Sequence, residues 1–192
     1  MGRAASAKKL RPVELLKLDL GCGPSKREGF HGVDQTGFAG VDTVCDLTKT
    51  PWPWLDNSVS EAHASHFVEH LTAWQRVAFW NELYRVLVPN GTAQIIVPHW
   101  ASCRAYGDPT HQWPPVSEFA FYYIKKDWRM ANAPHSDISI NPQGFNCDLE
   151  AVWGNGMRPD LTVRNPEFQQ FAMANYKEAI TDLFVTVKAL KA

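Results

Sequence analysis

The chain has 192 residues, which suits one domain of ordinary size, and its 45% hydrophobic content is enough to form a core. Lysine and arginine (19) nearly balance aspartate and glutamate (20), so the composition provides no overall positive field that would attract a nucleic acid. No apolar run approaches the roughly 20 residues of a membrane-spanning helix, and the four cysteines form no C-x-x-C pair, which favours a cytoplasmic protein without a disulfide framework.

The first predicted segment is a flexible, basic N-terminal tail over residues 1–14, and a single domain is expected over residues 15–192. Short apolar segments then predict four strands, at residues 15–20, 30–34, 41–46 and 59–64. A helix should follow, because Thr72 and Gln75 have the spacing of a capping box and apolar residues recur at helical spacing as far as Leu87.

The second half of the chain continues the alternation of helices and strands. Pro89-Asn90-Gly91 should end the helix by a breaker and a left-handed turn. The remaining predicted elements are strands at residues 92–97, 147–153 and 182–188 and helices at residues 117–125 and 166–177. Strands joined by helices or crossovers predict an α/β fold with a doubly wound, mostly parallel sheet and an antiparallel C-terminal strand.

Chemically informative residues stand where these strands end, which is where ligands bind in open α/β sheets. They are Asp19 with Gly21-Cys22-Gly23, Asp34, Asp46, Ser65 with His66, and His99. A glycine loop followed by spaced carboxylates suits a nucleoside, because glycine lets the backbone approach closely and a carboxylate accepts both ribose hydroxyls. The third glycine of a dinucleotide fingerprint would fall at Lys26 and is absent, which favours a ligand without a pyrophosphate.

Leu18-Asp19-Leu20-Gly21-Cys22-Gly23-Pro24 resembles the first motif of class I S-adenosylmethionine-dependent methyltransferases. Four further segments resemble motifs of that family in the family's order: Gly32-Val33-Asp34, Cys45-Asp46-Leu47, Phe67-Val68-Glu69-His70-Leu71 and the segment from Leu83 to Gly91. The resemblance covers residues 15–98. Ser25 departs from it, because many members have a third glycine there.

The resemblance implies S-adenosylmethionine as the cofactor, with a role for each matching residue. Gly21, Cys22 and Gly23 would line its methionine and ribose portion, and Asp19 would hold this loop. Asp34 would bind the ribose hydroxyls. Asp46 and Leu47 would meet the adenine, and Ser65 and His66 would approach the amino-acid end.

The acceptor is expected to lie beyond the fifth strand, in an acceptor-site or lid insertion over residues 99–145. His99 and His111 are candidate general bases, and Asp108 is a candidate catalytic partner, because histidine titrates near neutrality. Asp108 and His111 could equally pin the loop by hydrogen bonds. The candidate acceptor-binding residues are Arg104, Tyr106 and Trp113. Several of the eight tryptophans lie between Trp100 and Trp128, where aromatic side chains suit either a pocket wall or ordinary core packing.

The expected reaction is methyl transfer to oxygen or nitrogen of a small molecule. The alternatives are a nucleic-acid or protein methyltransferase and a non-catalytic subunit that only binds the cofactor. A zinc hydrolase is a further alternative, because His66-x-x-Glu69-His70 would place two histidines on one face of a helix. We expect Glu69 to be a structural carboxylate and the site to contain no metal.

Overall fold

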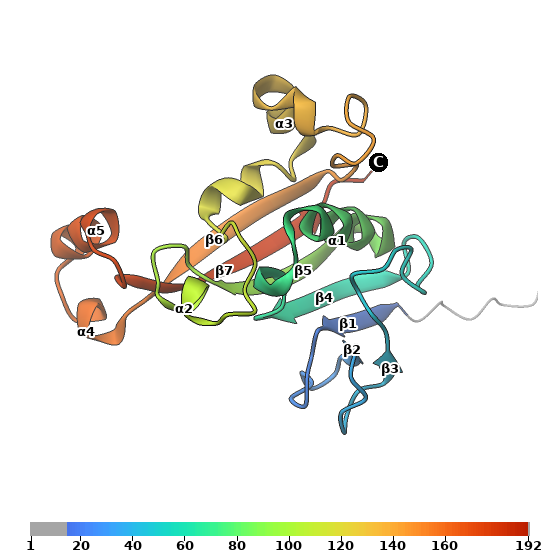
Figure 1. The fold of residues 1–192 in the computed structure, drawn as a ribbon, viewed down its shortest axis with the longest axis horizontal. Helices are drawn as coiled ribbons and strands as arrows, with labels where there is room; N and C mark the ends of the chain where they lie inside the picture. Colours follow the sequence, from blue (N-terminus) through green and yellow to red (C-terminus); the bar gives the residue numbers. More distant parts are fainter. Residues whose placement is uncertain (1–14, 192) are drawn as a thin grey trace, which may run out of the picture.

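The computed structural model describes residues 15–191, so the predicted tail over residues 1–14 lies outside the described residues. Within this range the chain forms a seven-stranded sheet with the order β3-β2-β1-β4-β5-β7-β6 (Figure 1). The strands are β1 (Leu16–Leu20), β2 (His31–Asp34), β3 (Thr43–Val44), β4 (Val59–Ser65), β5 (Leu87–Pro98), β6 (Leu149–Met157) and β7 (Ile180–Ala189). Neighbours from β3 to β5 are parallel, whereas β7 is antiparallel to β5 and β6. The predicted fold class is confirmed.

The helices are distributed unevenly along the chain. The α-helices are α1 (Ala73–Val86), α2 (Arg104–Gly107), α3 (Lys126–Asn132), α4 (Pro159–Thr162) and α5 (Pro166–Asn175), and the 3-10 helices are η1 (Val68–His70), η2 (Glu118–Tyr122) and η3 (Pro134–Ser136). In the part of the chain up to β5 that the structure describes, η1 and α1 are the only helices, and both lie between β4 and β5. Loops therefore make the crossovers from β1 to β4.

Alternating apolar residues place the core on the sheet and beneath α1. Leu18 and Leu20 of β1 are fully buried, as are Ala62 of β4 and Ile95 of β5. Helix α1 contributes Phe79 to the same cluster, and it lies across one face of the sheet (Figure 1). Complete burial of a leucine contributes about 1.5–3 kcal/mol, so this packing fixes the strand ends from which the site is built.

The start of α1 agrees with the sequence, but its end does not. The capping box is present, and the amide of Thr72 donates to Oε1 of Gln75 over 2.9 Å. The helix ends at Val86, however, because Leu87 is already extended and pairs with Val59. Pro89-Asn90-Gly91 lies within β5 instead of before it, and Asn90 is left-handed there with φ of 62°. The prediction that this tripeptide ends the helix was therefore wrong.

The segment from β5 to β6 is more structured than its sequence suggests. The helix predicted over residues 117–125 is only the short η2, and α3 follows it. Tyr122 stacks on Trp128 with ring centroids 5.4 Å apart, and Tyr122 also packs edge-on against Trp153 of β6. These aromatic rings pack on one another and on β6, as ordinary packing predicts, although Tyr122 remains 40% exposed. Helix α3 lies beyond β6, far from α2 in Figure 1.

The last connection, from β6 to β7, contains α4 and α5. The predicted helix at residues 166–177 is two residues shorter in the structure, where α5 begins after Asn165, whose side chain accepts the amide of Phe168 over 2.8 Å. Between residues 15 and 191, none of the helices has both the length and the apolar character that crossing a membrane requires.

Candidate active site

A cavity of about 340 Å³, here called the strand-end cavity, lies at the carboxyl ends of β1, β2, β3 and β4. Its lining residues are Gly21, Asp34, Gln35, Cys45, Asp46, Leu47, Thr48, His66, Phe67, His70 and Leu71. Five predicted cofactor-binding residues are thus brought together: Gly21, Asp34, Asp46, Leu47 and His66. They meet because parallel strands present their carboxyl ends at the same edge of the sheet.

The loop after β1 is held in place by backbone hydrogen bonds and by one buried carboxylate. The amides of Gly21 and Cys22 both donate to the carbonyl of Val33 at the end of β2. Asp19 is 3% exposed; its Oδ2 accepts the amide of Arg27 and its Oδ1 lies 2.7 Å from Nδ1 of His63. Asp19 therefore holds the loop through the amide of Arg27 and does not line the cavity.

The first glycine of the loop is required by both its backbone and its surroundings. Gly21 has φ of +69°, and a Cβ atom there would lie 2.4 Å from the ring of Phe67. Gly23 has φ of +54° but faces open space, with no atom within 4 Å of the Cβ position. The two glycines therefore share one backbone requirement and differ in packing.

We expect Gly21→Ala to lower the free energy of unfolding by more than the roughly 1–3 kcal/mol of a left-handed alanine, because the ring of Phe67 must also move. Gly23→Ala is the matched control, since it carries the backbone cost alone. Urea denaturation of both variants measures the difference. Equal losses would show that Phe67 does not restrict this position.

The two carboxylates of the cavity are held by hydrogen bonds from backbone amides and, for Asp46, from a hydroxyl. Asp34 accepts the amides of Thr36 and Gly23, each over 2.9 Å. Asp46 accepts the hydroxyl of Thr48 over 2.6 Å and the amide of Thr48 over 3.0 Å, and the hydroxyl hydrogen bond is the main cause that lowers the pKa of Asp46. Asp46 is therefore a carboxylate at neutral pH, with its position fixed before any ligand binds.

Several predicted residues lie outside this cavity, and several lining residues were missed. Cys22, Gly23 and Ser65 join Asp19 in not lining it. The missed residues are Gln35, Cys45, Thr48, Phe67, His70 and Leu71. A usable signal existed, because each of them adjoins a predicted residue or belongs to one of the segments that resemble methyltransferase motifs.

His66 stands at the turn that leaves β4. Its φ is +53°, which is unusual for a residue with a side chain. Its Nδ1 lies 3.2 Å from Oε1 of Glu69, and this hydrogen bond is the main cause that raises the pKa of His66. Because η1 begins only at Val68, His66 and His70 do not share a helix. The zinc-hydrolase alternative requires both histidines on one face of a helix, and residues 66–70 of the structure do not have that arrangement.

A second cavity of about 410 Å³, here called the α2 cavity, adjoins the first. Its lining residues are His66, Glu69, His70, Pro98, Cys103, Arg104, Gly107, Asp108 and His111. Three residues predicted for the acceptor side are among them: Arg104, which pairs with Asp182 over 2.7 Å, Asp108 and His111. His66 and His70 line both cavities, so the two spaces meet at these rings.

The other predicted acceptor-side residues lie elsewhere. His99 is buried outside both cavities; its Nδ1 accepts the amide of Ala101, which leaves Nε2 to donate to Glu118 over 3.1 Å. With both ring nitrogens engaged, His99 has no lone pair for a base. Tyr106 donates its hydroxyl to the carbonyl of Trp100, and Trp113 is 81% exposed; neither lines the α2 cavity. These three side chains therefore do not meet the other predicted acceptor-side residues in the α2 cavity.

Solved structures share this architecture over nearly the whole chain. A S-adenosylmethionine-dependent methyltransferase from Archaeoglobus fulgidus superposes with a TM-score of 0.58 at 20% identity, covering 91% of this chain and 86% of that one. A 1,6-didemethyltoxoflavin-N1-methyltransferase from Burkholderia thailandensis gives a TM-score of 0.54 at 11% identity, covering 92% and 71%. The chain has the fold of class I methyltransferases.

The same fold also supports other chemistry. The [4+2]-cyclase SpnF gives a TM-score of 0.51 at 15% identity, covering 93% of this chain and 75% of that one. Comparison of the sequence with protein-family models and with curated proteins gives no match. The activity must therefore be argued from the two cavities and not from the methyltransferase fold.

Proposed function

We propose that the protein is an enzyme that binds S-adenosylmethionine in the strand-end cavity and transfers its methyl group to oxygen or nitrogen of a small molecule in the α2 cavity. The observation that carries the proposal is that the two cavities meet at His66 and His70. Methyl transfer requires a donor and an acceptor held end to end, and two adjoining cavities with a shared wall supply that arrangement.

The residues of the strand-end cavity fit this cofactor. Its volume of about 340 Å³ is in the usual range for small-ligand sites. Asp34 would accept the ribose hydroxyls, and Asp46 and Leu47 would meet the adenine. When bound, the cofactor supplies an electrophilic methyl group on a sulfonium sulfur, so the chain mainly has to orient the acceptor.

A small acceptor fits the second cavity better than a polymer does. The α2 cavity is bounded by Arg104, Asp108 and His111 in one short segment of the chain. His111 donates from Nδ1 to the carbonyl of Ala105 over 3.1 Å, which leaves the lone pair of Nε2 free. The balanced net charge of −1 does not favour a nucleic acid.

We also propose that the protein works in the cytoplasm. All four cysteines are free thiols, and Cys147 is fully buried. Thiols without disulfides are typical of reducing compartments.

The proposal predicts that the protein binds one S-adenosylhomocysteine per chain by calorimetry and transfers a labelled methyl group to a component of a metabolite extract. Mass spectrometry of the labelled product identifies the acceptor. Label in RNA or protein fractions would contradict a small acceptor. Binding with no transfer to any fraction would support the non-catalytic alternative, and no binding would contradict the proposal as a whole.

A further inference from the structure

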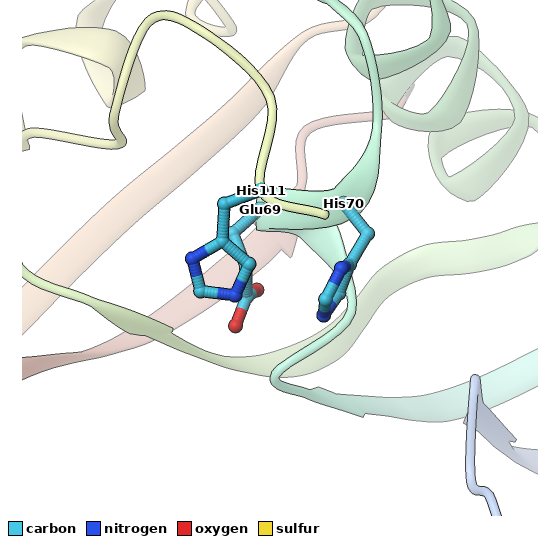
Figure 2. A group of neighbouring side chains, drawn as sticks. All are labelled: Glu69, His70 and His111. Carbon is cyan, nitrogen blue, oxygen red and sulfur yellow. The ribbon is translucent and has the colours of Figure 1, made fainter. Parts of the chain in front are cut away.

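Three potential metal ligands converge on the wall of the α2 cavity. Glu69 and His70 belong to η1, and His111 comes from the loop after α2. One ligand atom from each lies within 4.8 Å of the other two, so a single cation could contact all three. Figure 2 shows the carboxylate of Glu69 and both imidazole rings pointing toward the same side.

The hydrogen bonds of both histidines leave Nε2 free to bind a metal. Nδ1 of His111 faces the carbonyl of Ala105, which can only accept, so this nitrogen carries the proton. Nδ1 of His70 lies 3.0 Å from Oγ1 of Thr110, whose own hydroxyl donates to Asp108 over 2.7 Å. Nδ1 of His70 must then be the donor as well. An imidazole held through Nδ1–H by an oxygen is the usual state of a metal ligand.

Glu69 has a buried carboxylate oxygen that lacks a partner. The residue is 4% exposed, and its Oε1 is engaged by His66. Its Oε2 is buried and makes no hydrogen bond to any residue that the structure describes. An unpaired charged oxygen in the interior carries a large desolvation cost, which a bound cation would offset.

The two segments that carry the ligands are fastened to each other. The amide of Gln112 donates to the carbonyl of Glu69 over 2.9 Å. The guanidinium of Arg76, on α1, donates to the carbonyls of Glu69 and Gln112, bridging η1 and the loop of His111. The ligand positions are therefore set by the fold before any metal arrives, as a preorganised site requires.

We infer that Glu69, His70 and His111 bind one divalent first-row transition metal ion, of the class to which Zn²⁺ and Co²⁺ belong. Two imidazoles and one carboxylate suit such ions and leave coordination positions open, as in catalytic sites. The open positions would face the α2 cavity. The role that we assign to the ion rests on the proposed function: it would hold an oxygen or nitrogen atom of the acceptor beside His66 and His70, where the cavities meet.

The test is a Co²⁺ titration of chelator-treated protein, followed by its visible absorption and then by displacement with Zn²⁺. We expect one ion per chain. Glu69→Gln and His111→Gln should each weaken binding by at least about 10-fold, since loss of a residue that merely supports a ligand already costs roughly 10–100-fold. His135→Gln, which changes an exposed histidine on η3, is the matched control and should bind as the wild type does.

Thermal melting of each variant verifies that the chain is folded. No bound ion in the wild type, or affinity unchanged in both ligand variants, would overturn the inference. A similar loss in His135→Gln would also overturn it, because the ion would then be on the surface. Calorimetry with S-adenosylhomocysteine in the absence of metal tests the proposed function separately. Loss of metal binding and loss of cofactor binding can therefore be told apart.

Discussion

Asp34→Ala should weaken the binding of S-adenosylhomocysteine by roughly 100-fold or more. In the proposed site both ribose hydroxyls donate to this carboxylate, and each hydrogen bond to a charged group contributes about 1.5–3 kcal/mol. The variant also removes the acceptor of the Gly23 and Thr36 amides, so the glycine loop loses part of its anchoring. Isothermal titration calorimetry measures the affinity directly.

Asp42→Ala is the matched control for this prediction. Asp42 also accepts a backbone amide of β2, that of Gly32 over 2.7 Å, but it precedes β3, at the amino ends of these strands, and does not line the strand-end cavity. Its removal should leave the affinity close to that of the wild type. An affinity near normal in Asp34→Ala would contradict the ribose assignment, and equal losses in both variants would show that the effect arises from the loop alone.

Arg129→Met should lower the free energy of unfolding by about 3–5 kcal/mol, the usual result of removing one partner of a buried ion pair. Arg129 is 1% exposed; its Nη2 lies 2.7 Å from the carboxylate of Asp137, and its guanidinium also donates to the carbonyls of Tyr123 and Cys147. Methionine fills similar space but leaves Asp137 without its positive partner and removes these hydrogen bonds to the carbonyls. Urea denaturation provides the measurement.

Two comparisons show whether the loss arises from burial and charge. Lys125→Met breaks an exposed pair with Glu150 and should cost less than about 1 kcal/mol.

Burial raises the pKa of Asp137, but hydrogen bonds from Ser139 and Arg129 outweigh it and lower the pKa from 3.8 to about 2. The stability from this ionised carboxylate is thus present above pH 4 and is lost as the pH falls through about 2. A wild-type advantage over Arg129→Met that stays constant through this range would refute the contribution of charge.

The sequence was sufficient where a residue's place at the strand-end cavity follows from its position at the end of a strand. Asp34, Asp46 and His66 were predicted from their places at or just beyond strand ends, and the parallel sheet brings strand ends together whatever the loops do. The alternation of leucines around Leu18 likewise predicts a buried strand. The end of α1 was misplaced because Leu87 pairs with Val59, and this contact outweighed the breaker signal of the residues that follow.

The acceptor side could not be read in the same way. In the sequence, His99 and His111 are both histidines in a loop and cannot be told apart. In the structure, Ala101 and Glu118 occupy both ring nitrogens of His99, whereas His111 lines the α2 cavity. Tyr106 and Trp113 likewise do not line the cavity. Side-chain direction in an irregular segment depends on contacts with distant elements, which leave no periodic pattern in the sequence.

The sequence by itself determined the succession of strands along the chain and the glycine loop with its separated carboxylates, because these features depend on local periodicity and on strand ends. Only the tertiary structure decided that His111 returns to lie beside Glu69 and His70. That approach depends on the guanidinium of Arg76, which bridges two segments far apart in the chain. Such a convergence is set by packing and hydrogen bonding in three dimensions, which a local pattern of residues does not encode.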